Sequence, residues 1–243
     1  MNKSSALLPF SVFLSCLSFI SCFSSHETKE VFLPLSEQTE IIIDGIPNEP
    51  CWKEAVQITH FINPWNRQAE PYTNVNLLWN GSELYFYFIA HDTEVVLTDN
   101  FTTELDVSQE DRVELFFSSD LPLTRYYALE MDPLGRILDY EVNYPRKFNN
   151  SWNAGKHLHW TGKLTSYGYC VEGLIDSKLL TELTDGKKSF YLGAYRAEFS
   201  KDKNGDIIYE WLCIKDPHVD KPDFHVNETF IKINLQMNKN DSD

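Results

Sequence analysis

Hydrophobic and polar positions in this chain recur with the spacing of β-strands that are separated by tight turns. In residues 75–79, Val, Leu and Trp occupy alternate positions, as expected for a strand with one buried face. Asn80-Gly81 then supplies a favoured hairpin turn, and residues 84–90 form a continuous apolar and aromatic run. Because a run without alternation is buried on both faces, we expect residues 84–90 to form a central strand.

The same strand signals continue toward the end of the chain. A type I turn is expected at residues 132–135, where Pro occupies the second position and Gly the fourth. The further strands that we predict cover residues 113–117, 126–131, 137–142, 157–164, 169–175, 190–199, 207–212 and 230–235. Helical signals are confined to residues 50–56 and 177–183, and Asp176 or Ser177 can cap the second helix. The chain is therefore predicted to be all-β, an antiparallel, jelly-roll-like β-sandwich with one or two short helices.

The N-terminal segment has the pattern of an export signal. A single charge, Lys3, precedes an apolar run over residues 6–20, which is too short and too interrupted for a comfortable membrane span. Ser21-Cys22 resembles the cleavage site of bacterial lipoproteins, in which the cysteine is lipidated. A plain signal peptide cut near Ser25 is the alternative. We therefore expect an exported protein of the bacterial cell envelope, in the outer membrane or periplasm, with a lipid anchor on Cys22.

The expected domain organisation is a single domain that follows a processed leader. We assign residues 1–21 to the signal peptide, 22–40 to a polar tether, 41–237 to the β-sandwich and 238–243 to a polar tail. The alternative for part of the tether is a first edge strand at residues 31–33.

Charge and composition narrow the classes of partner. The formal net charge of −15 works against binding to nucleic acid phosphates and to anionic lipid surfaces. We therefore expect no nucleic acid partner, and membrane contact only through the N-terminal lipid anchor. Cys51, Cys170 and Cys213 lack the spacing of metal ligands, which leaves a structural zinc site without support. Aromatic residues make up 14% of the chain, which fits either a β core or a sugar-stacking surface.

Residues 43–52, Ile-Asp-Gly-Ile-Pro-Asn-Glu-Pro-Cys-Trp, combine a strand end, a tight Asp-Gly turn and a short helix that can place Trp52 under a sheet. This segment resembles the opening of family 9 carbohydrate-binding modules. Segments similar to the same family follow in the same order at residues 75–88, 111–116, 126–139, and 209–211 with 222–226. The resemblance covers roughly residues 41–235. It implies a β-sandwich that binds saccharides, typically at chain ends, often with bound calcium that supports the fold.

The resemblance also implies site residues. Glu114 matches the second acidic position of an Asp-x-x-Glu strand, where xylanase-linked members hold a carboxylate against sugar hydroxyls. Phe224 matches one of two aromatic residues that sandwich the sugar, a position that usually holds Trp. The second of these positions falls near Ser108, where the chain has no aromatic residue, and an arginine of the family site falls at Glu130. The residues that usually bind a terminal sugar in this family are therefore only partly present in this chain.

Other residues could complete such a site, and Glu130 is itself a candidate for contact with sugar hydroxyls. Trp152, in a polar loop-like stretch, is a candidate replacement platform, and a plug over the core is its alternative. Tyr140 and Tyr144 are further candidates for stacking. His225 is a candidate ligand contact, with a structural hydrogen bond as the alternative. Trp211 lies in a strand context and is expected in the core.

The leading functional hypothesis is non-catalytic saccharide binding that holds a polysaccharide or oligosaccharide near partner glycoside hydrolases or transporters. The first alternative is a structural or protein-binding sandwich that has lost the sugar site, which the residues at Ser108 and Glu130 suggest. The second alternative is a glycoside hydrolase that uses Glu114 and another carboxylate, which would have to face each other across a cleft. No cofactor is required, although the family resemblance admits Ca²⁺.

Overall fold

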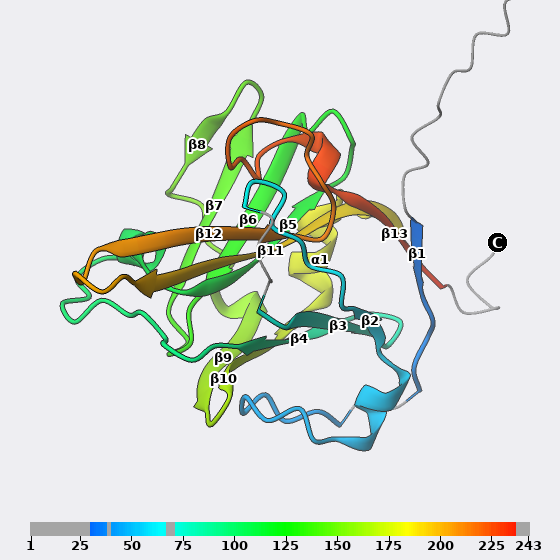
Figure 1. The fold of residues 1–243 in the computed structure, drawn as a ribbon. Coiled ribbons are helices and arrows are strands. Elements are labelled where there is room, and N and C mark those ends of the chain that lie inside the picture. The colour runs from blue at the N-terminus through cyan, green and yellow to red at the C-terminus, as the bar shows by residue number, and fades with distance from the viewer. Residues whose placement is uncertain (1–29, 38–39, 67–70, 237–243) are drawn as a thin grey trace, which may run out of the picture.

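The computed structural model describes residues 30–37, 40–66 and 71–236 (Figure 1). The predicted signal peptide at residues 1–21, the lipidation site Cys22 and the polar tail at residues 238–243 lie outside the described residues. None of the helices in the described part of the chain is long and apolar enough to span a membrane.

Two β-sheets form the two layers of the protein. The larger sheet has eight strands in the order β1-β13-β11-β5-β6-β7-β8, and β12 pairs with β11 beside this path. The smaller sheet has the order β2-β3-β4-β10-β9. The strands of the larger sheet are β1 (Glu30–Leu33), β5 (Arg112–Ser118), β6 (Arg125–Met131), β7 (Ile137–Asn143), β8 (Lys147–Asn149), β11 (Ser189–Lys201), β12 (Ile207–Cys213) and β13 (Ile231–Leu235).

The strands of the smaller sheet are β2 (Val56–Ile58), β3 (Thr73–Trp79), β4 (Leu84–His91), β9 (Leu158–Thr165) and β10 (Gly168–Ile175). The helices are α1 (Ser177–Thr184) and the 3-10 turns η1 (Pro50–Glu54), η2 (Glu104–Gln109), η3 (Gly155–His157) and η4 (Asn227–Thr229). Both predicted helices are present, and Asp176 caps α1 by accepting hydrogen bonds from the amides of Lys178 and Leu179. The predicted all-β sandwich is confirmed.

Four hydrophobic clusters hold the described parts of the sheets and their loops together. Alternate residues of β4 point to opposite faces, so Phe86 and Phe88 enter the core between the sheets while Tyr85 and Tyr87 lie under the outer loops. All four side chains are buried. β4 also pairs with β3 on one side and β10 on the other, which confirms the prediction of a central strand.

The family-like segment at residues 43–52 packs over the outer face of the smaller sheet. The ring of Trp52 meets Tyr87 edge-on, with 4.7 Å between ring centroids. Gly45 has a φ of 76°, which favours glycine, and its amide donates to Glu172 Oε2 at 2.9 Å. These contacts make the segment a structural cover of the sheet.

One part of the predicted tether belongs to the fold. Glu30–Leu33 form β1, which pairs in parallel with β13, and Lys232 Nζ lies 3.0 Å from Glu30 Oε1. The edge-strand alternative is therefore right for these residues and the tether interpretation is wrong for them. The reason is that the Leu33 side chain is buried in the core between the sheets. This burial stabilises the strand even though the segment around it is polar.

Strand alternation also creates the surface on which the site is built. On β5, the side chains of Arg112, Glu114 and Phe116 share the outer face of the larger sheet, while Val113 and Leu115 enter the core. The chain between β12 and β13 passes over this outer face and is held there in part by the Tyr195 hydroxyl, which donates to the Phe224 carbonyl at 3.2 Å.

Candidate functional site

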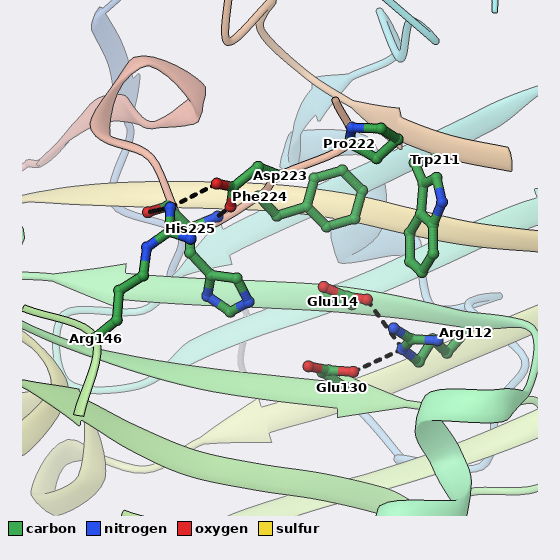
Figure 2. Close-up of a pocket in the computed structure, with 9 residues that line it drawn as sticks. All are labelled: Arg112, Glu114, Glu130, Arg146, Trp211, Pro222, Asp223, Phe224 and His225. Carbon is green, nitrogen blue, oxygen red and sulfur yellow. Dashed lines mark hydrogen bonds and ion pairs between the residues drawn. The ribbon is translucent and has the colours of Figure 1, made fainter. Parts of the chain in front are cut away.

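A cavity of about 460 Å³ lies on the outer face of the larger sheet, under the chain that joins β12 to β13. Figure 2 shows charged side chains from β5 and β6 on one side and rings from β12 and the joining segment on the other. The lining residues are Arg112, Glu114, Glu130, Arg146, Trp211, Pro222, Asp223, Phe224 and His225. The cavity therefore joins a charged floor to an aromatic wall.

The floor is a buried cluster of charges centred on Arg112. Glu114 and Glu130 lie directly opposite each other on β5 and β6. Arg112 Nε lies 3.0 Å from Glu114 Oε1 and 2.6 Å from Glu130 Oε2, and all three side chains are buried. Tyr140, on β7, donates from its hydroxyl to Glu130 Oε1 at 2.7 Å. One guanidinium thus orients two carboxylates toward the same cavity.

Burial and neighbouring charge set the protonation of this floor. Burial raises the pKa of Glu114 to about 8, the charge of Glu130 adds to this rise, and Arg112 opposes it. Glu114 is therefore mostly protonated at neutral pH and can donate a hydrogen bond as well as accept one. The floor presents a donor at Glu114, an acceptor at Glu130 and the guanidinium between them.

The aromatic wall is formed by Trp211 and Phe224. Phe224 is stacked on Tyr195, with 4.2 Å between centroids and 15° between planes, so one of its faces is already covered. The Trp211 ring meets Phe224 edge-on at 5.7 Å, and the Arg112 guanidinium lies 5.6 Å from the Trp211 centroid. The two rings are nearly perpendicular, at 77°, so they form a corner and do not form a parallel sandwich.

His225 and Arg146 close the other end of the cavity. His225 Nδ1 is hydrogen bonded to the Tyr126 hydroxyl at 2.8 Å, and burial lowers the pKa of His225, which favours the neutral ring. Arg146 Nη2 lies 2.5 Å from Asp223 Oδ2 and donates to the His225 carbonyl at 3.1 Å. This end of the cavity is therefore fixed by an ion pair at the surface.

The structure brings together most of the residues that the sequence predicts for the site. Glu114, Glu130, Phe224 and His225 all line the cavity. Tyr140 does not line it; the tyrosine lies behind Glu130 and holds that carboxylate. The structural hydrogen bond considered for His225 is present as well, because its ring is bonded to Tyr126.

Trp152 is placed elsewhere. Its ring packs on Tyr127 with 4.8 Å between centroids, and its Nε1 donates to Glu182 Oε1 at 2.8 Å. Since Tyr127 belongs to the core between the sheets, Trp152 plugs that core and is not a replacement platform in this cavity.

Sequence reasoning missed two important residues of the site. Arg112 lies two positions before Glu114, and strand alternation would have put both side chains on one face. Trp211 was expected in the core, which is wrong: it is partly buried and lines the cavity. No sequence signal distinguishes this role, because the contact of Trp211 with the cavity depends on the pairing of β12 with β11. Trp211 lines the cavity, whereas Ser108 does not.

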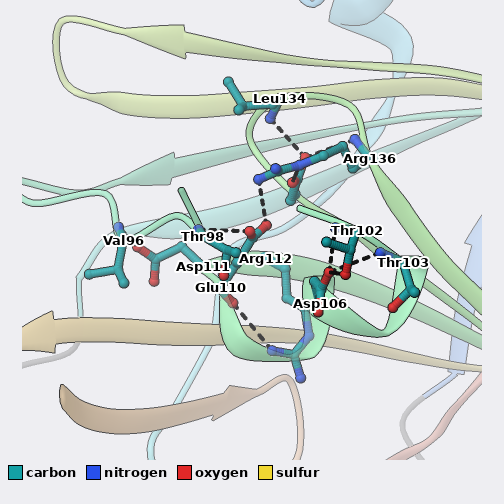
Figure 3. Close-up of polar contacts among 11 residues, drawn as sticks. Val96, Thr98, Thr102, Thr103, Asp106, Glu110, Asp111, Arg112, Leu134 and Arg136 are labelled. Carbon is teal, nitrogen blue, oxygen red and sulfur yellow. Dashed lines mark hydrogen bonds and ion pairs between the residues drawn. The ribbon is translucent and has the colours of Figure 1, made fainter. Parts of the chain in front are cut away.

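A second cluster of charges, formed by Asp111 (Figure 3) and two neighbouring carboxylates, offers oxygen ligands of the kind that calcium takes, which the family resemblance implies. Asp92, Asp111 and Glu198 each place one oxygen within 4.8 Å of the others. Asp92 Oδ2 accepts no hydrogen bond from any described residue, although its side chain is only 2% exposed. Arg196 donates to Glu198 and lies 3.6 Å from Asp92 Oδ2, so one positive charge faces three carboxylates. These oxygen ligands fit Ca²⁺.

An antiparallel β-sandwich with an aromatic and carboxylate-lined cavity has the architecture of a carbohydrate-binding module. Residues 43–237 match the family described as carbohydrate family 9 binding domain-like, and the chain belongs to this family. The family is non-catalytic, which agrees with the prediction that the chain is not an enzyme. Comparison with curated proteins gave no match.

Solved structures share the fold. One is a candidate carbohydrate-binding protein from Bacteroides uniformis, with a TM-score of 0.68 and 12% identity over 86% of this chain and 100% of that one. A family 9 carbohydrate-binding module from Caldicellulosiruptor kristjanssonii in complex with glucose has a TM-score of 0.54 and 17% identity over 88% of this chain and 98% of that one. The cellotriose complex of a family 9 module from the same organism gives the same TM-score and identity, with 88% and 97% covered.

Proposed function

We propose that this chain binds a saccharide, without catalysis, in the cavity between the Arg112 cluster and Trp211. The observation that carries the proposal is the meeting of two kinds of surface in one cavity. Glu114, Arg112 and Glu130 offer a fixed row of hydrogen-bonding groups, and Trp211 stands beside them with its ring partly exposed. A pyranose needs both, since its hydroxyls require polar partners and its C–H faces favour an aromatic ring.

Each residue has a separate role in this proposal. Trp211 covers an apolar face of the sugar, and Phe224 limits the cavity at the edge of that ring. Glu130 accepts a hydrogen bond from a sugar hydroxyl, and protonated Glu114 donates one. Arg112 Nε donates to Glu130 Oε2 and lies 3.0 Å from Glu114 Oε1, which accepts no hydrogen bond from a described residue. Preorganised groups of this kind lower the ordering cost of binding.

The same geometry argues against glycoside hydrolysis. A hydrolase needs two carboxyl groups on either side of the scissile bond. Here Glu114 and Glu130 lie against one nitrogen of Arg112, at 3.0 Å and 2.6 Å, so they occupy the same side of the cavity. Two carboxyl groups in this position can form hydrogen bonds with sugar hydroxyls, but they cannot lie on opposite sides of a glycosidic bond.

The complexes of family 9 modules with glucose and cellotriose support an oligosaccharide or polysaccharide as the ligand. The acidic net charge of −15 favours a neutral glycan over a polyanion. We also propose that Cys22 carries a lipid anchor after removal of residues 1–21. The chain would then hold a glycan at the bacterial cell envelope near glycoside hydrolases or transporters.

Calcium has a structural role in this proposal. Asp92, Asp111 and Glu198 would hold the ion, and its two positive charges would offset the carboxylate charge that Arg196 leaves unbalanced. The cluster lies at one end of the sandwich and shares no lining residue with the cavity at Trp211. The ion would therefore stabilise the fold without touching the saccharide there.

Calorimetric titration with glucose, cellotriose and a panel of plant, algal and host oligosaccharides tests the saccharide site. We expect at least one ligand to bind the parent protein and to lose about fivefold or more in affinity in Trp211→Ala, since the stacking contacts of one ring are worth about 1 kcal/mol or more. Tyr209→Ala is the matched control, because Tyr209 is an exposed ring on the same strand outside the cavity. Absence of binding across the panel would overturn the proposal and favour the protein-binding alternative.

A further inference from the structure

Three aromatic rings form a row across the ends of neighbouring strands of the smaller sheet. Tyr72 precedes β3, His91 ends β4, and Tyr167 lies in the turn between β9 and β10. The ring centroids of Tyr72 and His91 are 4.9 Å apart, and those of His91 and Tyr167 are 5.0 Å apart. All three side chains are exposed, and Tyr72 and Tyr167 show 48% and 42% of their surface to solvent.

The backbone fixes this aromatic row. The His91 amide donates to the Tyr72 carbonyl at 2.8 Å, and the Asp92 amide donates to the Tyr167 carbonyl at 2.9 Å. Gly168 has a φ of +138°, and a Cβ at this position would lie only 2.2 Å from the Ala90 carbonyl oxygen. The close approach of the turn to β4 therefore requires glycine, and it brings Tyr167 against His91.

The aromatic row borders a second cavity, of about 820 Å³. His91 and Tyr167 line it together with the hydroxyl side chains of Thr93, Thr165 and Ser166. Asp92 and Glu198 line it as well, so the proposed calcium cluster borders the same cavity. Among the described residues, none lines both this cavity and the cavity at Trp211.

We propose that the aromatic row and the adjoining cavity form a second saccharide-binding surface. Exposed rings held rigidly by the backbone offer stacking area at low entropic cost, and neighbouring hydroxyl groups can donate and accept hydrogen bonds. The net charge of −15 disfavours an anionic ligand, so the ligand class is a neutral polysaccharide. Two surfaces on one domain would engage separate parts of one long chain and strengthen retention through effective concentration.

The inference does not depend on the Trp211 cavity and can be tested apart from it. The test compares the parent protein with Tyr72→Ala/Tyr167→Ala, with Trp211→Ala, and with Phe32→Ala as a control that removes an exposed ring from β1. Probes are glucose and cellotriose in calorimetry, and hydroxyethylcellulose, xylan and mannan in affinity electrophoresis, all with calcium present. Circular dichroism of each variant checks that the fold is kept.

We expect Tyr72→Ala/Tyr167→Ala to weaken retention by at least one polysaccharide about tenfold while affinity for any small sugar that binds the parent is unchanged. The Trp211→Ala variant should keep part of the retention. The triple variant Tyr72→Ala/Tyr167→Ala/Trp211→Ala should lose it. Equal retention of the double variant and the parent would overturn the inference, as would failure of every polysaccharide to retard the parent. If small sugars do not bind but retention still falls in the double variant, the Trp211 proposal fails and the second surface stands.

Discussion

Glu114 on β5 and Glu130 on β6 are directly paired neighbours, and a single buried guanidinium, that of Arg112, lies within 3.0 Å of both carboxyl groups. Two acids beside each other inside a protein are costly unless a counter-charge is built in. Arg112 supplies this counter-charge from the same strand as Glu114. The two carboxyl groups therefore face the cavity together, beside one shared positive charge.

The first prediction concerns this shared guanidinium. Arg112→Met should lower the free energy of unfolding by about 3–5 kcal/mol at pH 7.5, because it leaves the buried Glu130 without its counter-charge and hydrogen-bond donor. Urea denaturation measures the effect. Arg125→Met is the control: Arg125 also pairs with a carboxylate, Asp185, but its side chain is 40% exposed, and its loss should cost about 1 kcal/mol or less. Equal effects of the two substitutions would contradict a buried charge cluster.

The second prediction concerns pH. Burial raises the pKa of Glu114 from 4.5 to about 8, so the folded protein keeps a proton that the unfolded chain has lost between these values. The folded state is then penalised as pH rises, and stability should fall through this window by at most about 1.4 kcal/mol per pH unit for this carboxyl group. Glu114→Gln should flatten that fall, as measured by denaturation from pH 5 to 8. An unchanged slope would assign the pH dependence to other carboxyl groups, such as Asp111.

The third prediction concerns the wall of the cavity. Phe224→Trp restores the aromatic residue that is usual in the family, but the Phe224 ring is 6% exposed and already stacked on Tyr195. The larger ring should therefore overpack the site and cost about 1–3 kcal/mol in unfolding free energy. Thermal denaturation tests this, with the partly exposed Trp211→Phe as the matched aromatic exchange. A more stable Phe224→Trp variant would show that the loop can move outward to accept it.

The fourth prediction concerns calcium. Addition of Ca²⁺ at about 100 times its dissociation constant should stabilise the folded protein by about 2.7 kcal/mol, and chelation should reverse this. Asp92→Asn should abolish the gain, because Asp92 supplies the oxygen that lacks a hydrogen-bond partner. Asp202→Asn is the control, since Asp202 lies in the exposed turn between β11 and β12. A calcium gain that survives Asp92→Asn would place the ion elsewhere.

The fifth prediction concerns Gly168. Gly168→Ala should destabilise the fold by more than Gly205→Ala, because a Cβ at residue 168 meets the Ala90 carbonyl oxygen at 2.2 Å whereas a Cβ at residue 205 meets nothing within 4 Å. Both glycines have positive φ, at +138° and +88°, so the comparison separates steric overlap from backbone strain. Denaturation of the two variants measures the difference. Equal losses would mean that only backbone conformation matters at residue 168.

Local patterns in the sequence predicted the fold well. The alternation at residues 75–79 and the continuous run at residues 84–90 correspond to β3 and the central strand β4. Every residue of β3 is buried, so the alternation identified the strand but not the burial of its second face, which the segments packed on the outside of the sheet produce. β1 was harder to identify, because four residues with one buried Leu carry little periodic signal. Its place beside β13, some 200 residues away in the sequence, is a long-range pairing.

The sequence by itself determined the sandwich, the family and the position of Glu114 on a strand, because strand periodicity and turn chemistry are local properties. Only the tertiary structure decided which rings stand beside Glu114. In the folded chain Trp152 packs on Tyr127 at the core, whereas Trp211 and Phe224 line the cavity at Glu114. Arg112 became the shared partner of two acids only through strand pairing. Residue type tells whether a ring can stack, but its neighbours across the sheets decide whether it does.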